Sequence, residues 1–229
     1  PLKRNSQNHH LIALRSLLRY LIRSEDLEVL PVEKVELAKE DEREIKVLNS
    51  EELRRLLATP DLKTPRGKRD KAILELLFSS GMRVSELTSL DVEDVNFETR
   101  EIPVLGKGGK RRVVFLSDDA GQALADYLKA REEKFKPLFI NFMKRGEDKE
   151  NRLTVRAIQK MIKKYGRKAG LSSDPTPHTM RHTFATDLLR EGADIRAVQE
   201  MLGHKDISTT QIYTHVTNPQ LKKVHEKYH

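Results

Sequence analysis

The chain of 229 residues contains no cysteine, and this absence excludes disulfide bonds, thiolate metal sites and cysteine nucleophiles together. It has no apolar run near the roughly 20 residues of a membrane-spanning helix, and no signal peptide is visible. We therefore expect a cytoplasmic protein without membrane contact. A chain of this length can bury a substantial core, in one large domain or in one domain and part of another.

Positive charge is gathered in clusters. Lysine and arginine outnumber aspartate and glutamate by 43 to 35, and the net charge of +8 favours a polyanionic partner. A single basic cluster is more often a solvated helix face. Three separate clusters, at residues 63–71, 106–112 and 160–168, favour contacts with DNA phosphates. The side chains expected to make them are Lys68, Arg69, Lys110, Arg111, Arg112, Lys160, Lys163, Lys164 and Arg167.

Apolar spacing divides the chain near residue 45. Residues 6–23 carry leucine and isoleucine at helical intervals, and the charge-rich residues 33–46 predict a short helix followed by a linker. Asn49 and Glu52 then form a capping-box pattern that begins a new helix. We expect two parts, residues 1–45 and residues 46–229.

The larger part is predicted to be mainly α with a small antiparallel β-sheet, an α+β fold. The apolar period changes to two on both sides of Gly106–Lys110, which predicts a hairpin. Residues 138–142 are a further candidate strand. Helices are predicted at residues 67–80, 83–90, 118–134, 154–169, 177–191 and 194–202, then in a segment carrying Tyr213 and in an amphipathic tail at residues 218–229.

A spaced set of side chains in this part can attack a phosphodiester without a metal. Two guanidinium groups, which stay charged at neutral pH, can hold phosphate oxygens in pairs of hydrogen bonds. They supply the fixed positive charge that a phosphoryl-transfer transition state needs. The candidate catalytic residues are Arg83, Lys107, His178, Arg181, His204 and Tyr213.

Tyr213 is the candidate nucleophile. A free phenol has a pKa of about 10, so a base or nearby cations must assist it. His178 is the candidate base, His204 a candidate hydrogen-bond donor to phosphate, and Lys107 the candidate general acid for the leaving oxygen. Attack by tyrosine conserves the bond energy, so neither a nucleotide nor a metal cofactor is required.

Four segments carry these residues and resemble the tyrosine recombinases, especially the Xer-type resolvases and related integrases. They are SSGMRVSELTSL (79–90), GKGGKRRVVFL (106–116), TPHTMRHTFATDLLREGADIRAVQEMLGH (176–204) and STTQIYTHV (208–216). The resemblance covers about residues 47–229. It implies an active site built from the six candidate residues, with Glu86 in support; we expect His182 to be a structural hydrogen-bonding residue close by.

The same resemblance implies the reaction and its partners. Members form a 3′-phosphotyrosine, pass through a Holliday junction and act as a homotetramer on two DNA duplexes that carry recombination sites. A C-terminal tail, here residues 218–229, docks on a neighbouring protomer. Chromosome dimer resolution, integration or excision of a mobile element, and activation by an accessory protein all stay open. The family's helical DNA-clamping domain is more than twice as long as residues 1–45, which we therefore expect to be a partial version of it.

Three other functions compete with this interpretation. Residues 195–216 resemble a helix-turn-helix, which would suit a DNA-binding regulator without enzymatic activity. His178 and His182, with His204 as a third ligand, could form a metallohydrolase site, although Thr179 stands where the usual zinc motif has glutamate. A type IB topoisomerase would use similar residues for nicking and closing DNA.

Overall fold

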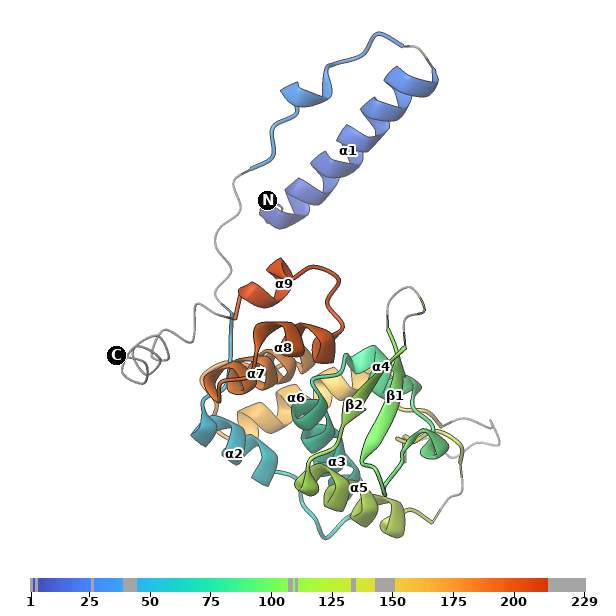
Figure 1. The fold of residues 1–229 in the computed structure, drawn as a ribbon, viewed down its shortest axis with the longest axis vertical. Helices are drawn as coiled ribbons and strands as arrows, with labels where there is room; N and C mark the ends of the chain where they lie inside the picture. The colour runs from blue at the N-terminus through green and yellow to red at the C-terminus, as the bar shows by residue number, and fades with distance from the viewer. Residues whose placement is uncertain are drawn as a thin grey trace. The chain divides into compact units, whose positions relative to one another are not determined.

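The computed structural model describes residues 2, 4–25, 27–38, 45–106, 109, 111–132, 135–142 and 151–213. The chain divides into two compact units, residues 1–44 and 45–229. Figure 1 shows the course of each.

The smaller unit is one helix and a segment that returns along it. Helix α1 (Arg4–Ser24) confirms the helix predicted at residues 6–23, and Leu18 packs against Val32 and Val35 of the return segment. The return segment contains a single 3-10 turn, η1 (Val32–Lys34), so the short helix expected after residue 33 is wrong for the described residues up to 38. Arg15 Nε donates to Val35 O (2.7 Å), which helps to hold this segment extended along α1.

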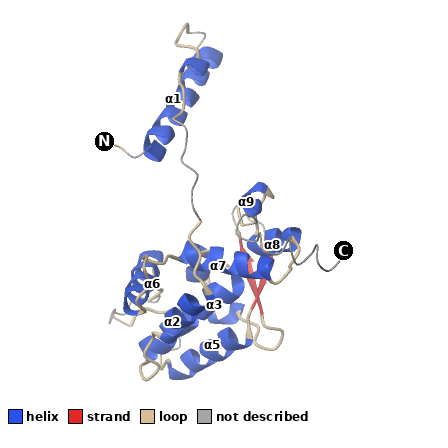
Figure 2. Cartoon of the chain, turned by 90° about the vertical axis from the view of Figure 1, so that its left-hand side faces the viewer, coloured by secondary structure: helices blue, strands red, loops and turns tan. Residues whose placement is uncertain are grey.

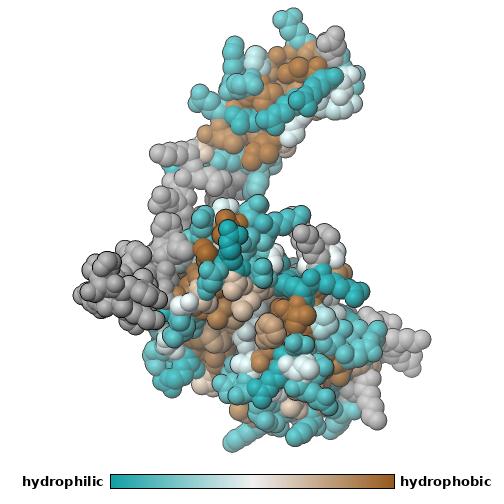
Figure 3. All heavy atoms as spheres, in the orientation of Figure 1, coloured by the Kyte–Doolittle hydropathy of each residue, from teal (hydrophilic) through white to brown (hydrophobic). Residues whose placement is uncertain are grey.

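Several apolar side chains of α1 remain exposed, among them Ile12, Leu14 and Leu17. In Figure 3 apolar residues form a brown run along this unit, with hydrophilic residues on either side.

The larger unit is mainly helical. In chain order it contains α2 (Ser50–Ala58), α3 (Pro65–Ser80), α4 (Val84–Ser89), η2 (Val92–Asp94), β1 (Glu101–Leu105), β2 (Arg111–Phe115), α5 (Asp118–Ala130), α6 (Val155–Lys168), α7 (Pro177–Arg190), α8 (Ile195–Leu202) and α9 (Ser208–Gln211). Helix α3 is central and packs against α2, α5 and α7, which surround it in Figures 1 and 2. Because it is covered on several sides, Ile73, Leu74, Leu76 and Leu77 are all fully buried.

Most of the predicted helix ends are confirmed. The Asn49 side chain accepts from Glu52 N (2.8 Å) while Glu52 returns a bond to Asn49 N (3.0 Å), completing the capping box. Gly81 and Gly203 end α3 and α8 in the left-handed conformation, with φ of 58° and 63°. Helix α9 ends at Gln211, so the expectation that a helix carries Tyr213 is wrong, since Tyr213 follows it.

The predicted hairpin is also confirmed. Strands β1 and β2 pair antiparallel with Val104 opposite Arg112, and they lie beside α8 (Figure 2). Residues 138–142 do not form a strand, because Ile140 makes only an isolated bridge with Arg152. The hairpin residues Lys107 and Lys110 and the tail at 218–229 lie outside the described residues.

Substituting Gly81 tests the left-handed end of α3. A Cβ atom there would lie 2.3 Å from Phe184 Cδ1, at a φ of 58°. We expect Gly81→Ala to lower the free energy of unfolding by about 2–4 kcal/mol, from overpacking and backbone strain together, as measured by urea denaturation.

Gly121→Ala is the matched control for this substitution. Its Cβ would meet nothing within 4 Å inside α5, so a gain of up to about 1 kcal/mol is expected. A Gly81→Ala protein as stable as the Gly121→Ala protein would contradict this account.

Candidate active site

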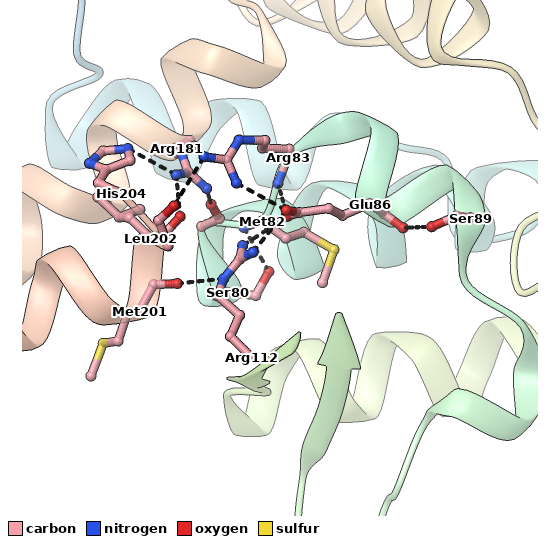
Figure 4. Close-up of polar contacts among 12 residues, drawn as sticks. Ser80, Met82, Arg83, Glu86, Ser89, Arg112, Arg181, Met201, Leu202 and His204 are labelled. Atoms are coloured by element: carbon pink, nitrogen blue, oxygen red, sulfur yellow. Dashed lines mark hydrogen bonds and ion pairs between the residues drawn. The ribbon is translucent and has the colours of Figure 1, made fainter. Parts of the chain in front are cut away.

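Three arginines and one glutamate meet at one point of the larger unit. Arg83 is the residue before α4, Glu86 lies in α4, Arg112 on β2 and Arg181 on α7. Figure 4 shows the guanidinium groups gathered between Glu86 and the end of α8 that leads to His204. These segments are distant in the sequence, so only the folded chain assembles the cluster.

Glu86 is the negative centre of the cluster and is 5% exposed. It accepts hydrogen bonds from Arg83 N (2.7 Å), Arg83 Nη1 (3.0 Å), Arg112 Nη1 (2.8 Å) and Arg112 Nη2 (2.8 Å). Burial by itself would raise the pKa of Glu86, but the bonds from Arg112 and Arg83 outweigh it and the pKa is lowered. The carboxylate is therefore ionised at neutral pH.

Arg181 is held by the carbonyl ends of two helices and is 4% exposed. Its Nη1 donates to Gly81 O (2.5 Å) and its Nη2 to Leu202 O (2.5 Å), at the ends of α3 and α8. Unpaired carbonyls at a helix C-terminus carry partial negative charge, which favours a cation. Burial, followed by repulsion from Arg83 and Arg112, lowers the pKa of Arg181 to about 10, so it stays charged at neutral pH.

His204 contacts the cluster as a hydrogen-bond acceptor. Its Nε2 lies 3.0 Å from Arg181 Nη2, which can only donate, and its Nδ1 lies 2.9 Å from Thr210 Oγ1. Burial and then repulsion from Arg181 lower the pKa of His204 to about 4, so the ring is neutral at pH 7. The proton assigned by these partners is on Nδ1. The expected donation from His204 to phosphate does not fit this arrangement, because Nε2 accepts from Arg181.

The hydroxyl of Tyr213 is bonded to His182. The two atoms, Tyr213 Oη and His182 Nδ1, are 2.9 Å apart, and the Tyr213 side chain is 1% exposed. Burial, and then repulsion from His178 and Arg181, lowers the pKa of His182 to about 4, so the ring is neutral at pH 7. In the tautomer that carries its proton on Nε2, His182 Nδ1 accepts the phenolic hydrogen. Burial raises the pKa of Tyr213 itself, against an opposing effect of Arg181.

His178 is therefore not the base that touches Tyr213 in this arrangement. Its side chain is exposed, and its ring centroid lies 6.3 Å from that of His182. Sequence reasoning gave His182 only a supporting place, because the choice between two histidines one helical turn apart depends on where Tyr213 lies. The sequence around His182 does not show where Tyr213, 31 positions further along the chain, lies in the folded protein.

Two of the side chains expected to contact DNA phosphates point into the protein instead. Arg69 is 4% exposed and donates to the Asp70 carboxylate (2.6 Å) and to Ile140 O (2.7 Å). Arg112 belongs to the Glu86 cluster, and its side chain is 12% exposed. A signal for Arg112 was present in the sequence, because β2 alternates and Arg112 faces the same side as buried Val114.

The other described residues of that set lie at the surface or are half-buried. Arg111, Lys160 and Lys164 are exposed, and Lys68 is half-buried. Lys163 and Arg167 are exposed and form ion pairs with Asp174 (2.7 and 2.9 Å). Together the bonds from Arg167 and Lys163 lower the pKa of Asp174 to about 2.

The competing interpretations find little support in this geometry. Among the described residues, no three histidine or acidic side chains are grouped so that they could hold a metal ion. His182 Nδ1 and both ring nitrogens of His204 already have hydrogen-bonding partners within the protein. The second helix of the proposed helix-turn-helix is α9, only four residues long, which is short for a helix that must cross a DNA groove.

Residues 46–219 match the model of the phage integrase family, which is most of the chain. The chain belongs to the phage integrase family. The predicted family is thus confirmed, and with it the activity of a tyrosine recombinase, an enzyme that cleaves and rejoins DNA.

Curated relatives agree with this assignment. The tyrosine recombinase XerD of Staphylococcus epidermidis is 42% identical over 222 residues, which cover 94% of this chain and 73% of the relative. The tyrosine recombinase XerC of Haemophilus influenzae is 41% identical over 231 residues, covering 100% of this chain and 76% of the relative.

A solved structure of the same kind supports the fold. The XerH site-specific recombinase bound to palindromic difH substrate, in a post-cleavage complex, aligns with a TM-score of 0.80 at 25% identity. The alignment covers 97% of this chain and 67% of that one. The mainly α fold with a small antiparallel sheet is confirmed.

The two buried histidines give the protein a specific acid sensitivity. Their pKa values of about 4 in the folded state lie below the ordinary value of 6.5, so between these values the unfolded chain binds more protons. We expect the urea midpoint to fall as the pH is lowered from 6.5 to 5, with an uptake of about two protons on unfolding near pH 5.

Substituting one of these histidines should make the urea midpoint depend less steeply on pH between 5 and 6.5. His182→Gln and His204→Gln are each expected to reduce the slope of this dependence, because each substitution removes one of the two histidines whose pKa is lowered by the fold. An unchanged slope in His182→Gln would show that this histidine is not held neutral by the fold.

Proposed function

We propose that the chain performs site-specific recombination through a covalent 3′-phosphotyrosyl intermediate, with Tyr213 as the nucleophile. One observation carries the proposal. Consecutive residues of α7 hold the two halves of the chemistry, since Arg181 lies in the cationic cluster and His182 bonds the Tyr213 hydroxyl. A phosphate bound at the cluster would therefore lie close to the phenol.

Arg83 and Arg181 are the proposed phosphate ligands. In the unbound chain their guanidinium groups donate to backbone carbonyls, with Arg83 Nη2 reaching Gly203 O at 3.4 Å. The non-bridging oxygens of a phosphate are stronger acceptors for a guanidinium than carbonyls are. Both groups are fixed before DNA arrives, so they stabilise the charge of the transition state with little reorganisation.

Proton transfer follows from the hydrogen bond at Tyr213. The phenolic proton passes to His182 Nδ1 as the Tyr213 oxygen forms its bond to phosphorus. Burial is the largest cause of the lowered pKa of His182, and repulsion from His178 and Arg181 adds to it. The negative charge of a bound phosphate opposes that repulsion, so it raises the pKa and makes the ring a better base. His178, exposed beside His182, can pass the proton to solvent.

The bond between phosphorus and the 5′-oxygen of DNA breaks in the same step. That oxygen needs a proton, for which Lys107 on the β1–β2 connection is the proposed donor. Rejoining reverses each transfer: a 5′-hydroxyl attacks the phosphotyrosine and gives its proton to Lys107, while His182 returns its proton to the departing phenolate of Tyr213. No external source of energy is consumed.

The wider assembly is proposed from the resemblance and the relatives. The XerH relative is bound to its DNA substrate, and we infer that double-stranded DNA with recombination sites is the partner here. Exposed Arg111, Lys160 and Lys164 are proposed phosphate contacts. Four protomers on two duplexes would pass through a Holliday junction, with residues 218–229 exchanged between neighbours.

Residues 1–45 are proposed to be part of a helical DNA-clamping domain. Within the described part of the chain, no helix is both long and apolar enough to cross a membrane. We propose that the enzyme acts on DNA in the cytoplasm.

Tyr213→Phe tests the proposed function. One oxygen is lost from a buried ring, so covalent capture of nicked DNA carrying candidate recombination sites should fall at least about a thousandfold. The dissociation constant for the same DNA should change by less than about threefold, since the phenol contributes chemistry rather than charge. Denaturing electrophoresis with peptide mapping measures the adduct, and gel shift measures binding.

Tyr127→Phe is the matched control. Tyr127 is also fully buried and its hydroxyl accepts from Ile140 N (3.3 Å), away from the cluster. This variant should form the adduct at the wild-type rate. Strand cleavage by Tyr213→Phe, or an adduct mapped to another residue, would overturn the proposal.

A further inference from the structure

Arg112 contacts both the acidic centre of the site and the end of α8. Its Nη1 and Nη2 donate to the two oxygens of Glu86 (both 2.8 Å), and its Nε donates to Met201 O (3.0 Å). One planar group thus joins β2, α4 and α8, as Figure 4 shows. A guanidinium is rigid, so the three elements must keep a fixed spacing around it.

The same side chain shapes the backbone at Gly203. A Cβ atom built there would lie 3.1 Å from Arg112 Cδ and 3.3 Å from Arg112 Nε. The carbonyl of Gly203 in turn accepts from Arg83 Nη2 (3.4 Å). Arg112 and Arg83 therefore share two neighbours: both donate to Glu86, and both lie against Gly203 at the end of α8.

Charge explains why a second arginine on Glu86 matters. Glu86 Oε1 accepts from both Arg83 Nη1 (3.0 Å) and Arg112 Nη1 (2.8 Å). Without Arg112 the buried carboxylate would have Arg83 as its one cationic partner and would compete with a DNA phosphate for that guanidinium. With Arg112 present, Glu86 is satisfied and the charge of Arg83 remains available.

We propose that Arg112 is a positioning residue for phosphate activation, which neutralises Glu86 and so leaves Arg83 free to bind the reacting phosphate. The inference rests on the proposed function. It replaces the expectation that Arg112 contacts DNA, and it assigns the residue a role through Arg83 rather than contact with the substrate.

Cleavage of a DNA substrate that is uncharged at the cleavage position distinguishes a role of Arg112 in phosphate activation from a merely structural role. A methylphosphonate at the cleavage position replaces a charged non-bridging oxygen by a methyl group, so the reacting group no longer needs full neutralisation by Arg83. Arg112→Ala should slow adduct formation about a hundredfold on ordinary nicked DNA. On methylphosphonate DNA the loss should be less than about tenfold, with DNA affinity within about threefold of wild type on both.

Two further variants test the route through Arg83. If Arg112 acts through Arg83, the double variant Arg83→Ala/Arg112→Ala should be no slower than Arg83→Ala alone. Arg112→Lys, which keeps the charge but loses the paired donors, should fold and recover part of the rate. It keeps the test decisive if Arg112→Ala is too unstable to study.

Arg54→Ala is the control for the loss of an arginine–glutamate pair. Arg54 Nη2 donates to Glu51 Oε1 (2.8 Å) on α2, where both side chains are exposed, and its loss should leave adduct formation unchanged on both substrates.

Equal losses on the two substrates, or losses that multiply in the double variant, would overturn the inference in favour of a general structural role. Weakened DNA binding with a normal rate would overturn it in favour of a DNA contact. Absence of any Tyr213 adduct with the wild-type protein on the same DNA would instead count against the proposed function.

Discussion

The buried carboxylate of Glu86 is the constraint on which the site depends. Three guanidinium groups gathered at one point repel one another, and this repulsion from Arg83 and Arg112 adds to burial in lowering the pKa of Arg181. The single charge of Glu86 is shared between Arg83 and Arg112, which both donate to it, and the carbonyl ends of α3 and α8 stabilise Arg181. The C-terminal ends of α3 and α8 therefore help to form the active site, because their carbonyls hold Arg181.

This arrangement explains why the two glycines stand where they do. Gly81 and Gly203 take a left-handed conformation that ends α3 and α8, which leaves the last carbonyls of each helix free to accept from arginine. A side chain at Gly81 would collide with Phe184, and one at Gly203 would press on Arg112. The left-handed conformation and the close packing favour glycine at these positions, and the carbonyls that accept from arginine follow from where the two helices end.

Burial, with repulsion from the nearby cations, sets the protonation state of the two histidines. Both His182 and His204 are neutral at pH 7. His204 accepts from Arg181, and His182 is hydrogen-bonded to the Tyr213 hydroxyl. A bound phosphate would partly cancel the repulsion from these cations. The basicity of His182 would thus rise when DNA binds, so that the phenol is activated when a phosphate is there to be attacked.

Much of the fold was predictable because it depends on local rules. The capping box at Asn49 and the glycine stops at Gly81 and Gly203 follow from backbone chemistry that the sequence displays directly. The site was only partly predictable. Arg69 and Arg112 lie in basic runs that favour a surface position. Arg69 is nevertheless buried because α3 is covered on several sides, and Arg112 because it faces the buried side of β2.

Replacing Glu86 by glutamine tests the central claim most directly. The side chain keeps its size and one acceptor oxygen but loses the charge that holds Arg83 and Arg112 together. We expect Glu86→Gln to fold and to bind DNA, while covalent capture of nicked DNA slows by about a hundredfold or more. Capture within about threefold of the wild-type rate would contradict the claim, because the arginines would then be organised without the buried carboxylate.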